Sequence, residues 1–203
     1  AETPGRSTRP SLPAAVGVVL VAFMAMLPLL NLSLPGILPT PTYMPGTLAL
    51  LSLCMVFAAL ALTLQAWWLL GLLEHAVADT VRYTREREQF GRTLISFQGV
   101  GFQLADMAVA VEALGELGKY TLWRVATVRD GSLVDAVALR SAALSAASTV
   151  LRGAHQLHGA MGFTDEVDVS WLSRASQMVR RLPGGAHRTA GRLVTLVGAD
   201  GWA

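Results

Sequence analysis

Apolar residues recur at helical spacing through most of this chain. Beyond residue 91 they return every three or four positions with polar residues between them, which is the pattern of helices that bury one face. The pattern predicts one helix over residues 97–129, a second that follows Ser132 and runs through residues 136–158, a third over about 164–182 and a fourth over 186–197. The segments between them are short, and short connections favour antiparallel neighbours. We therefore expect a mainly α protein built as an up-and-down four-helix bundle.

Residues at the expected helix ends agree with this division. Ser132 is suited to cap the second helix and Gly159 to stop it, because serine accepts a backbone hydrogen bond and glycine adopts a positive φ. Thr164 or Asp165 can cap the third helix in the same way. Alanines are dense between residues 136 and 158, which permits close approach of a neighbouring helix.

The first third of the chain is different, because no charged residue or histidine occurs from Ser11 to Leu73. Residues 13–30 and 48–73 are each apolar enough to suggest a membrane-spanning helix. However, Asn31 and a cluster of prolines break the first run into short pieces such as 16–24 and 29–34, which equally suit buried strands. A membrane hairpin and a protein-buried segment both remain open.

The second run continues without a break signal into residues 74–83, where one face becomes polar. A single long helix, buried along its first half and amphipathic along its second, explains this change. We accordingly divide the chain into a short N-terminal β or irregular segment, residues 1–45, and a helical bundle domain, residues 46–203.

Composition narrows the possible partners and compartment. The 203 residues are 53% apolar and 15% charged, so one substantial core is expected. The formal net charge is only +2 and the basic residues are spread along the chain, which argues against nucleic acid as a partner. A single cysteine, Cys54, excludes an internal disulfide and fits a reducing compartment, so we expect a cytoplasmic protein.

Two segments carry the candidate chemistry. The first is Arg85–Gln98, which reads RERE-QFGRTLISFQ, and the second is Gln156–Glu166, which reads QLHGAMGFTDE. Both combine charged or amide side chains with glycines near helix ends, where a phosphate-bearing cofactor can approach closely. Together they resemble the C-terminal half of an acyl-CoA dehydrogenase. The similarity is specific over about residues 71–182.

The resemblance implies an FAD site at a boundary between subunits. An arginine at the position of Arg87 would reach the FAD pyrophosphate of a neighbouring subunit, and the end of the 136–158 helix would lie against the adenosine part. Arginine suits the first role because its guanidinium is permanently charged and offers a planar fork of donors. The residues that the resemblance assigns to FAD are Arg87, Gln89, Phe97, Gln98, Gln156, His158, Gly159 and Ala160.

Each of these residues also has a simpler interpretation. Arg87 could pair with Glu86 or Glu88 at a solvated helix end, which would contribute little. Gln98 could cap its helix and Gln156 could be a surface amide. His155 and His158 are spaced to share a helix face, but no further ligand stands convincingly beside them, so we expect no metal site.

Departures from the family pattern concern the catalytic base. Dehydrogenation in this family needs a glutamate, and counting along the motifs puts its two usual positions on Pro183-Gly184-Gly185 and near Ala61, where no side chain accepts a proton. The resemblance also covers only about half of a full family member. The expected function is therefore a dehydrogenase subunit that completes an FAD site in a homologous partner and lacks its own base.

Two other hypotheses remain. An unrecognised acid such as Glu74 or Glu166 could serve as the base. Alternatively, the chain could be a noncatalytic, membrane-associated helical scaffold.

Overall fold

The computed structural model describes residues 44–127 and 132–198. The chain divides into two compact units, residues 1–58 and 59–203. The described part of the first unit is the beginning of helix α2 (Met44–Glu86), where Leu53 and Phe57 are exposed. The expected strands and membrane span within residues 13–34 lie outside the described residues. The division at residue 45 stays a prediction.

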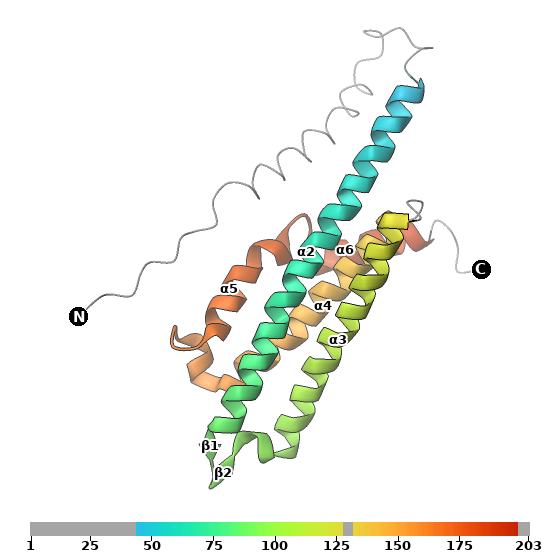
Figure 1. Cartoon of the computed structure of the whole chain (residues 1–203). Helices are drawn as coiled ribbons and strands as arrows, with labels where there is room; N and C mark the ends of the chain where they lie inside the picture. Colours follow the sequence, from blue (N-terminus) through green and yellow to red (C-terminus); the bar gives the residue numbers. More distant parts are fainter. Residues whose placement is uncertain (1–43, 128–131, 199–203) are drawn as a thin grey trace. The chain divides into compact units, whose positions relative to one another are not determined.

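The second unit is helical, as the hydrophobic pattern predicts (Figure 1). After α2 come the two-stranded hairpin β1 (Glu88–Gln89) and β2 (Arg92–Thr93), the 3-10 helix η1 (Leu94–Ser96), α3 (Gln98–Thr127), α4 (Ser132–His158), the 3-10 helix η2 (Gly159–Phe163), α5 (Asp168–Arg181) and α6 (Ala186–Gly198). The four helices predicted beyond residue 91 are confirmed, and so is the long helix before it.

The predicted helix caps are less accurate. Ser132 is itself the first residue of α4, and α5 begins only at Asp168, after Val167. Thr164 instead donates its hydroxyl to the Met161 carbonyl at 2.8 Å and so closes η2. Asp165 pairs with Arg174 at 2.6 Å. Both side chains are used in these contacts, and neither caps α5.

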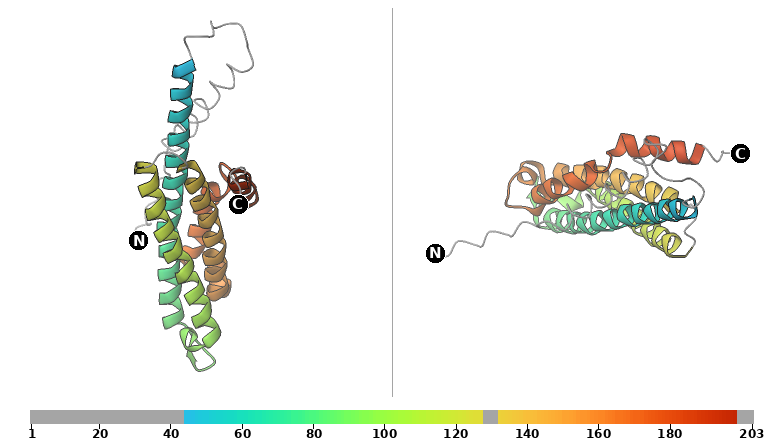
Figure 2. Two further views of the ribbon diagram at one scale, coloured as in Figure 1. Left: turned by 90° about the vertical axis from the view of Figure 1, so that its right-hand side faces the viewer. Right: turned by 90° about the horizontal axis from the view of Figure 1, so that it is seen from above.

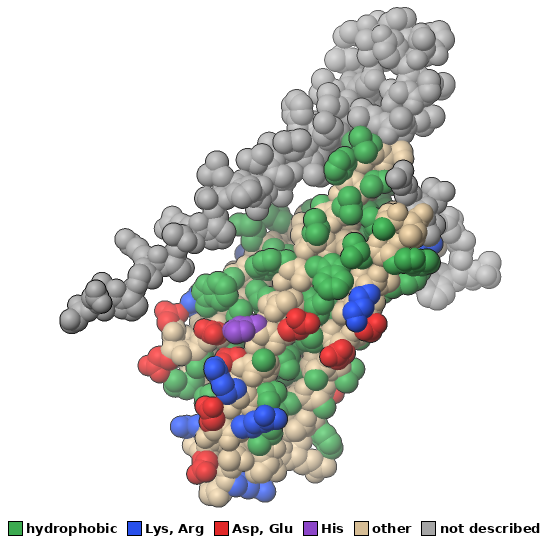
Figure 3. Space-filling model, viewed as in Figure 1, with side chains coloured by type: hydrophobic (Ala, Val, Ile, Leu, Met, Phe, Trp, Pro, Cys, Tyr) green, Lys and Arg blue, Asp and Glu red, His purple; other side chains and the backbone are tan. Residues whose placement is uncertain are grey.

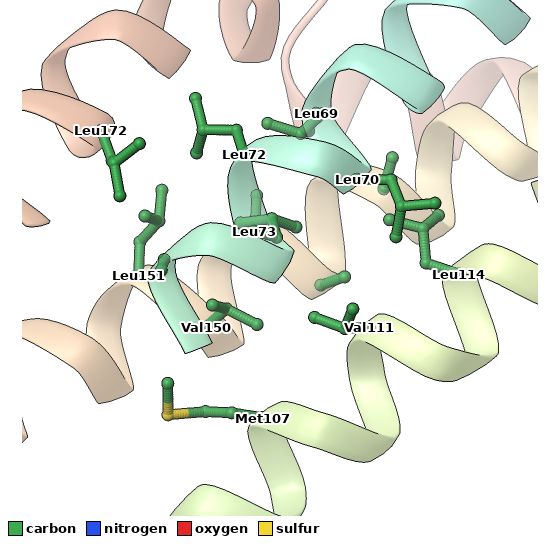
Figure 4. Close-up of a cluster of buried hydrophobic side chains, with 14 of the residues drawn as sticks. Leu69, Leu70, Leu72, Leu73, Met107, Val111, Leu114, Val150, Leu151 and Leu172 are labelled. Atoms are coloured by element: carbon green, nitrogen blue, oxygen red, sulfur yellow. The ribbon is translucent and has the colours of Figure 1, made fainter. Parts of the chain in front are cut away.

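One hydrophobic core joins α2, α3, α4 and α5 (Figure 4). Along α3 the buried positions alternate in steps of three and four residues, which keeps one face toward the bundle. These positions are Leu104, Met107, Val111, Leu114, Gly118, Thr121 and Val125. Leu122, although apolar, is 45% exposed because it falls outside this face. The up-and-down bundle expected from the sequence is therefore the observed architecture.

Small residues allow the helices to approach closely. A Cβ at Gly153 of α4 would lie 2.6 Å from Met107 Sδ of α3. At Gly118, a Cβ would lie 3.3 Å from the Trp67 indole of α2. Figure 2 shows α3 beside α4 and α6 beside α4, and both pairs are in contact. Helix α4 is thus the central element, since it also contacts α5.

Two helical segments, Leu51–Glu86 and Ser132–Phe163, are long and apolar enough to cross a membrane. Half of the apolar window in the second segment is buried inside the bundle, as in a core helix. Several large apolar side chains of the second unit are nevertheless exposed, among them Leu64, Trp68 and Trp123. On the face that Figure 3 shows, charged side chains are concentrated toward the β1–β2 hairpin, and hydrophobic side chains predominate farther along the bundle.

Candidate functional site

The first motif forms a tight hairpin at one end of the bundle. Phe90 and Gly91, the two residues between the strands, have φ angles of 56° and 75°. Positive φ at both positions is the geometry of a type I′ turn, in which the chain reverses within two residues. The Leu94 N–H donates to the Arg87 carbonyl at 2.9 Å and closes the base of the hairpin. These two short strands were not predicted from the sequence.

Phe97 packs against its own hairpin. The Arg92 guanidinium carbon lies 3.8 Å from the centroid of the Phe97 ring, and the Phe90 ring meets it edge-on with centroids 6.3 Å apart. Cation–π and edge-to-face contacts of this kind hold a ring in one orientation. Phe97 is half-buried by these contacts, whereas Gln98 opens α3 and is exposed.

Arg87 stands directly after α2 and is exposed. Its N–H continues the helix by donating to the Tyr83 carbonyl at 2.8 Å. Within the described residues its guanidinium forms no ion pair, so pairing with Glu86 or Glu88 is not observed. Gln89, in β1, is also exposed. A cationic group and an amide are therefore both available to a ligand at this end of the bundle.

The second motif is a sharp reversal after α4. Gly159 has a φ of 58°, which ends the helix as the sequence predicts. The turn then folds back so closely that a Cβ at Gly162 would lie 3.1 Å from the His158 Cβ and 3.3 Å from His155 Nδ1. Gln156, Gly159 and Ala160 are exposed around this turn.

His158 joins the two motifs. Its ring stacks on Tyr83, with centroids 4.3 Å apart and planes inclined by 22°, and its Nδ1 donates to the Ala154 carbonyl at 2.9 Å. The side chain is completely buried, and Nε2 lies 3.7 Å from an Asp79 carboxylate oxygen. Since Tyr83 is one helical turn before Arg87, these contacts bring both motifs to the same end of the bundle. The His158 ring itself faces the protein interior.

A cavity of about 270 Å³ lies elsewhere in the second unit. Its wall includes Leu62 of α2, Pro183 and Gly184 from the α5–α6 connection, and three arginines. Counting along the motifs placed the family's catalytic glutamate at Pro183–Gly185 or near Ala61. Pro183 and Gly184 line this cavity, and Ala61 adjoins Leu62, which also lines it. Among the described residues no carboxylate lines it. Glu74 and Glu166 are exposed and do not line it.

The three arginines of this cavity are Arg140 of α4 and Arg188 and Arg192 of α6. Arg140 is only 1% exposed and uses Nη2 to donate to the carbonyls of Val179 and Leu182, the latter at 2.7 Å. Burial lowers the pKa of the Arg140 guanidinium. This residue was not predicted from the sequence. Its signal is that Arg140 is the lone charged residue between Asp135 and Arg152 on an otherwise apolar and small-residue helix.

His155 and His158 serve packing within the bundle. The His155 ring stacks on Phe163 with centroids 5.0 Å apart, and burial lowers its pKa. In the described part of the chain no three metal-ligating side chains come together.

Comparison with known proteins identifies the family. The family profile described as "Acyl-CoA dehydrogenase, C-terminal domain" matches residues 58–199, more than two-thirds of the chain. The chain belongs to the acyl-CoA dehydrogenase family. The matched region contains both motifs, the Tyr83–His158 contact and the three cavity arginines, so the resemblance stated from the sequence is confirmed.

Similar family members come from several bacteria. The short-chain specific acyl-CoA dehydrogenase of Clostridium acetobutylicum is 33% identical over 118 residues, which are 57% of this chain and 30% of that protein. Acyl-CoA dehydrogenase FadE28 of Mycobacterium tuberculosis is 32% identical over 134 residues, which are 64% of this chain and 38% of that protein. The chain therefore spans about a third of the length of these relatives.

The fold is likewise that of known family structures. A chain of the ChsE4–ChsE5 complex of Mycobacterium tuberculosis superposes with a TM-score of 0.68 at 29% identity, covering 74% of this chain and 40% of that one. Butyryl-CoA dehydrogenase of Megasphaera elsdenii gives a TM-score of 0.62 at 26% identity, covering 73% and 38%. The predicted bundle of the acyl-CoA dehydrogenase C-terminal type is confirmed.

Proposed function

We propose that this chain is part of an FAD-dependent acyl-CoA dehydrogenase and contributes one side of an FAD site at a subunit interface. The observation that carries the proposal is the exposed guanidinium of Arg87, which has no acidic partner among the described residues, at the end of the bundle where both family motifs meet. Such an arginine is suited to a diphosphate, because its planar fork matches two phosphate oxygens. The residues around it therefore fit the cofactor.

The other residues have complementary roles in this proposal. Gln89 and Gln98 supply amide donors and acceptors beside Arg87, and Phe97 presents a ring held in place by Arg92. Gln156, Gly159 and Ala160 form the exposed turn that approaches the adenosine part. His158 acts from inside, because its buried ring holds this turn against α2 through Tyr83.

The proposed reaction is α,β-dehydrogenation of acyl-CoA thioesters. When bound, FAD would accept the hydride from the acyl β-carbon, while a carboxylate removes the α-proton. The lack of a carboxylate among the described residues around the cavity at Pro183 and Gly184 supports a chain without its own base. The base would then come from another polypeptide.

A homologous acyl-CoA dehydrogenase subunit is the proposed partner, in the cytoplasm. One observation supports it: a similar structure is that of the ChsE4–ChsE5 complex. Exposed Leu64, Trp68 and Trp123 also provide apolar surface for association. Acyl-CoA thioesters are the proposed substrates.

Replacing Arg87 by alanine tests the FAD assignment. The assembled complex should bind FAD at least about tenfold more weakly, since a hydrogen bond to a charged group is worth about 1.5–3 kcal/mol. Flavin absorbance and native mass spectrometry of the purified complex measure the occupancy. Arg85→Ala is the matched control, because Arg85 is an exposed arginine two residues away. Equal flavin content in the two variants would contradict the proposal.

The alternative function is a membrane-associated helical scaffold. It rests on the length and apolar character of Leu51–Glu86. Retention in the membrane fraction after a high-salt wash would favour this alternative, whereas a soluble yellow complex with a longer homologous chain would favour the dehydrogenase.

A further inference from the structure

The cavity beside Pro183 holds a buried positive charge whose hydrogen bonds are incomplete. Arg140 is almost fully buried, and its Nε and Nη1 have no hydrogen-bond partner in the part of the chain that the structure describes. Only Nη2 is used there, toward the carbonyl groups at the end of α5. Leaving a buried cation and its donors unpaired is costly. Because Arg140 lines the cavity, the structure places an incompletely hydrogen-bonded guanidinium group at this wall.

Two further guanidinium groups border the same space. Arg188 and Arg192 lie one turn apart on α6, are exposed, and form no ion pair among the described residues. The first turn of α6, which begins at Ala186, contributes to the wall through Arg188 and Thr189. A helix N-terminus adds partial positive charge to the surroundings. Every charged group that lines the cavity, within residues 44–127 and 132–198, is thus positive.

We propose that this cavity binds an oxyanion of the phosphate type. Three guanidinium groups, one of them buried with free N–H donors, match the charge and the several acceptor oxygens of a phosphoryl group. The volume of about 270 Å³ accommodates such a group together with water. The ligand is either free phosphate or the phosphoryl group of a larger molecule.

This inference goes beyond the proposed FAD site and is independent of it. Arg140 and His158 are 18 residues apart on α4, which places them about 27 Å apart along the helix. The oxyanion site can therefore be tested without flavin or acyl-CoA. A failure here would leave the FAD assignment unaffected, and the reverse also holds.

Calorimetric titration of the full chain with inorganic phosphate tests the proposal, at about 0.15 M salt so that unspecific charge effects are screened. We expect saturable binding with one site per chain. Arg188→Ala and Arg192→Ala should each raise the dissociation constant by about tenfold, and the double variant should abolish binding. Both side chains are exposed, so their removal leaves the fold intact.

Arg152→Ala is the control, because Arg152 is an exposed arginine of α4 that does not line the cavity. Its affinity for phosphate should equal that of the wild type. A parallel titration with adenosine monophosphate separates the two ligand sources: competition with phosphate indicates the phosphoryl group of a larger molecule, and no binding indicates the free ion. Absence of saturable phosphate binding, or equal effects of Arg152→Ala and Arg192→Ala, would overturn the proposal.

Discussion

The close approach of α3 and α4 makes a quantitative prediction at Gly153. In an open helix, replacing glycine by alanine stabilises a protein by about 0.5–1 kcal/mol. At Gly153, however, the new Cβ would lie 2.6 Å from Met107 Sδ and 3.1 Å from Met107 Cγ. Met107 is fully buried, so its side chain cannot move into solvent to relieve the clash. Overpacking of this kind costs about 1–3 kcal/mol.

The net effect of Gly153→Ala should therefore be a loss of about 1 kcal/mol in the free energy of unfolding, whereas Gly71→Ala should gain about 0.5–1 kcal/mol. Gly71 is the matched control, because it is an exposed glycine in α2, and a Cβ added there would have no described atom within 4 Å beyond its own helix backbone and chain neighbours. Urea denaturation followed by circular dichroism at a helical wavelength measures both values.

A double-mutant cycle identifies the cause. Met107→Ala alone should destabilise the chain, because it leaves a cavity in the core. The double variant with Met107→Ala and Gly153→Ala should lose at least about 0.5 kcal/mol less free energy of unfolding than the two single variants lose together. The reason is that the methyl group added at residue 153 then has room. Strict additivity in this cycle, or a Gly153→Ala variant as stable as Gly71→Ala, would refute the packing argument.

Two further predictions concern titratable side chains. Burial lowers the pKa of His155 in the folded chain, so the unfolded state binds a proton more readily than the folded state does. The contribution of neutral His155 to the free energy of unfolding is therefore complete above about pH 6.5, and it is lost as the pH falls through the lowered pKa of the folded chain. His155→Gln should weaken this acid-side loss in urea titrations below about pH 6.5. For catalysis, Glu74→Gln and Glu166→Gln should leave turnover of the assembled complex unchanged, because both side chains are exposed and neither lines the cavity. If either change abolished turnover while flavin stayed bound, the changed residue would be the base.

Local features of the sequence determined most of the helical architecture. Periodicity set the extent of α3, α4 and α6, and Gly159 marked the end of α4 because only a positive φ fits there. The same local reasoning failed at Thr164 and Asp165, because both side chains are used in contacts that depend on how the chain turns between η2 and α5.

In the candidate site, too, some features follow from the sequence and others depend on tertiary packing. The resemblance of the two motifs to acyl-CoA dehydrogenases indicated the family from sequence alone, and it singled out Arg87, Gln98 and Gln156, which the structure shows to be exposed. The stacking of His158 on Tyr83 and the meeting of Arg140 with Arg188 join residues far apart in the chain, so only tertiary packing decided them. A helical pattern specifies which face is buried, but which side chains meet across that face depends on how closely the helices approach and at which glycines.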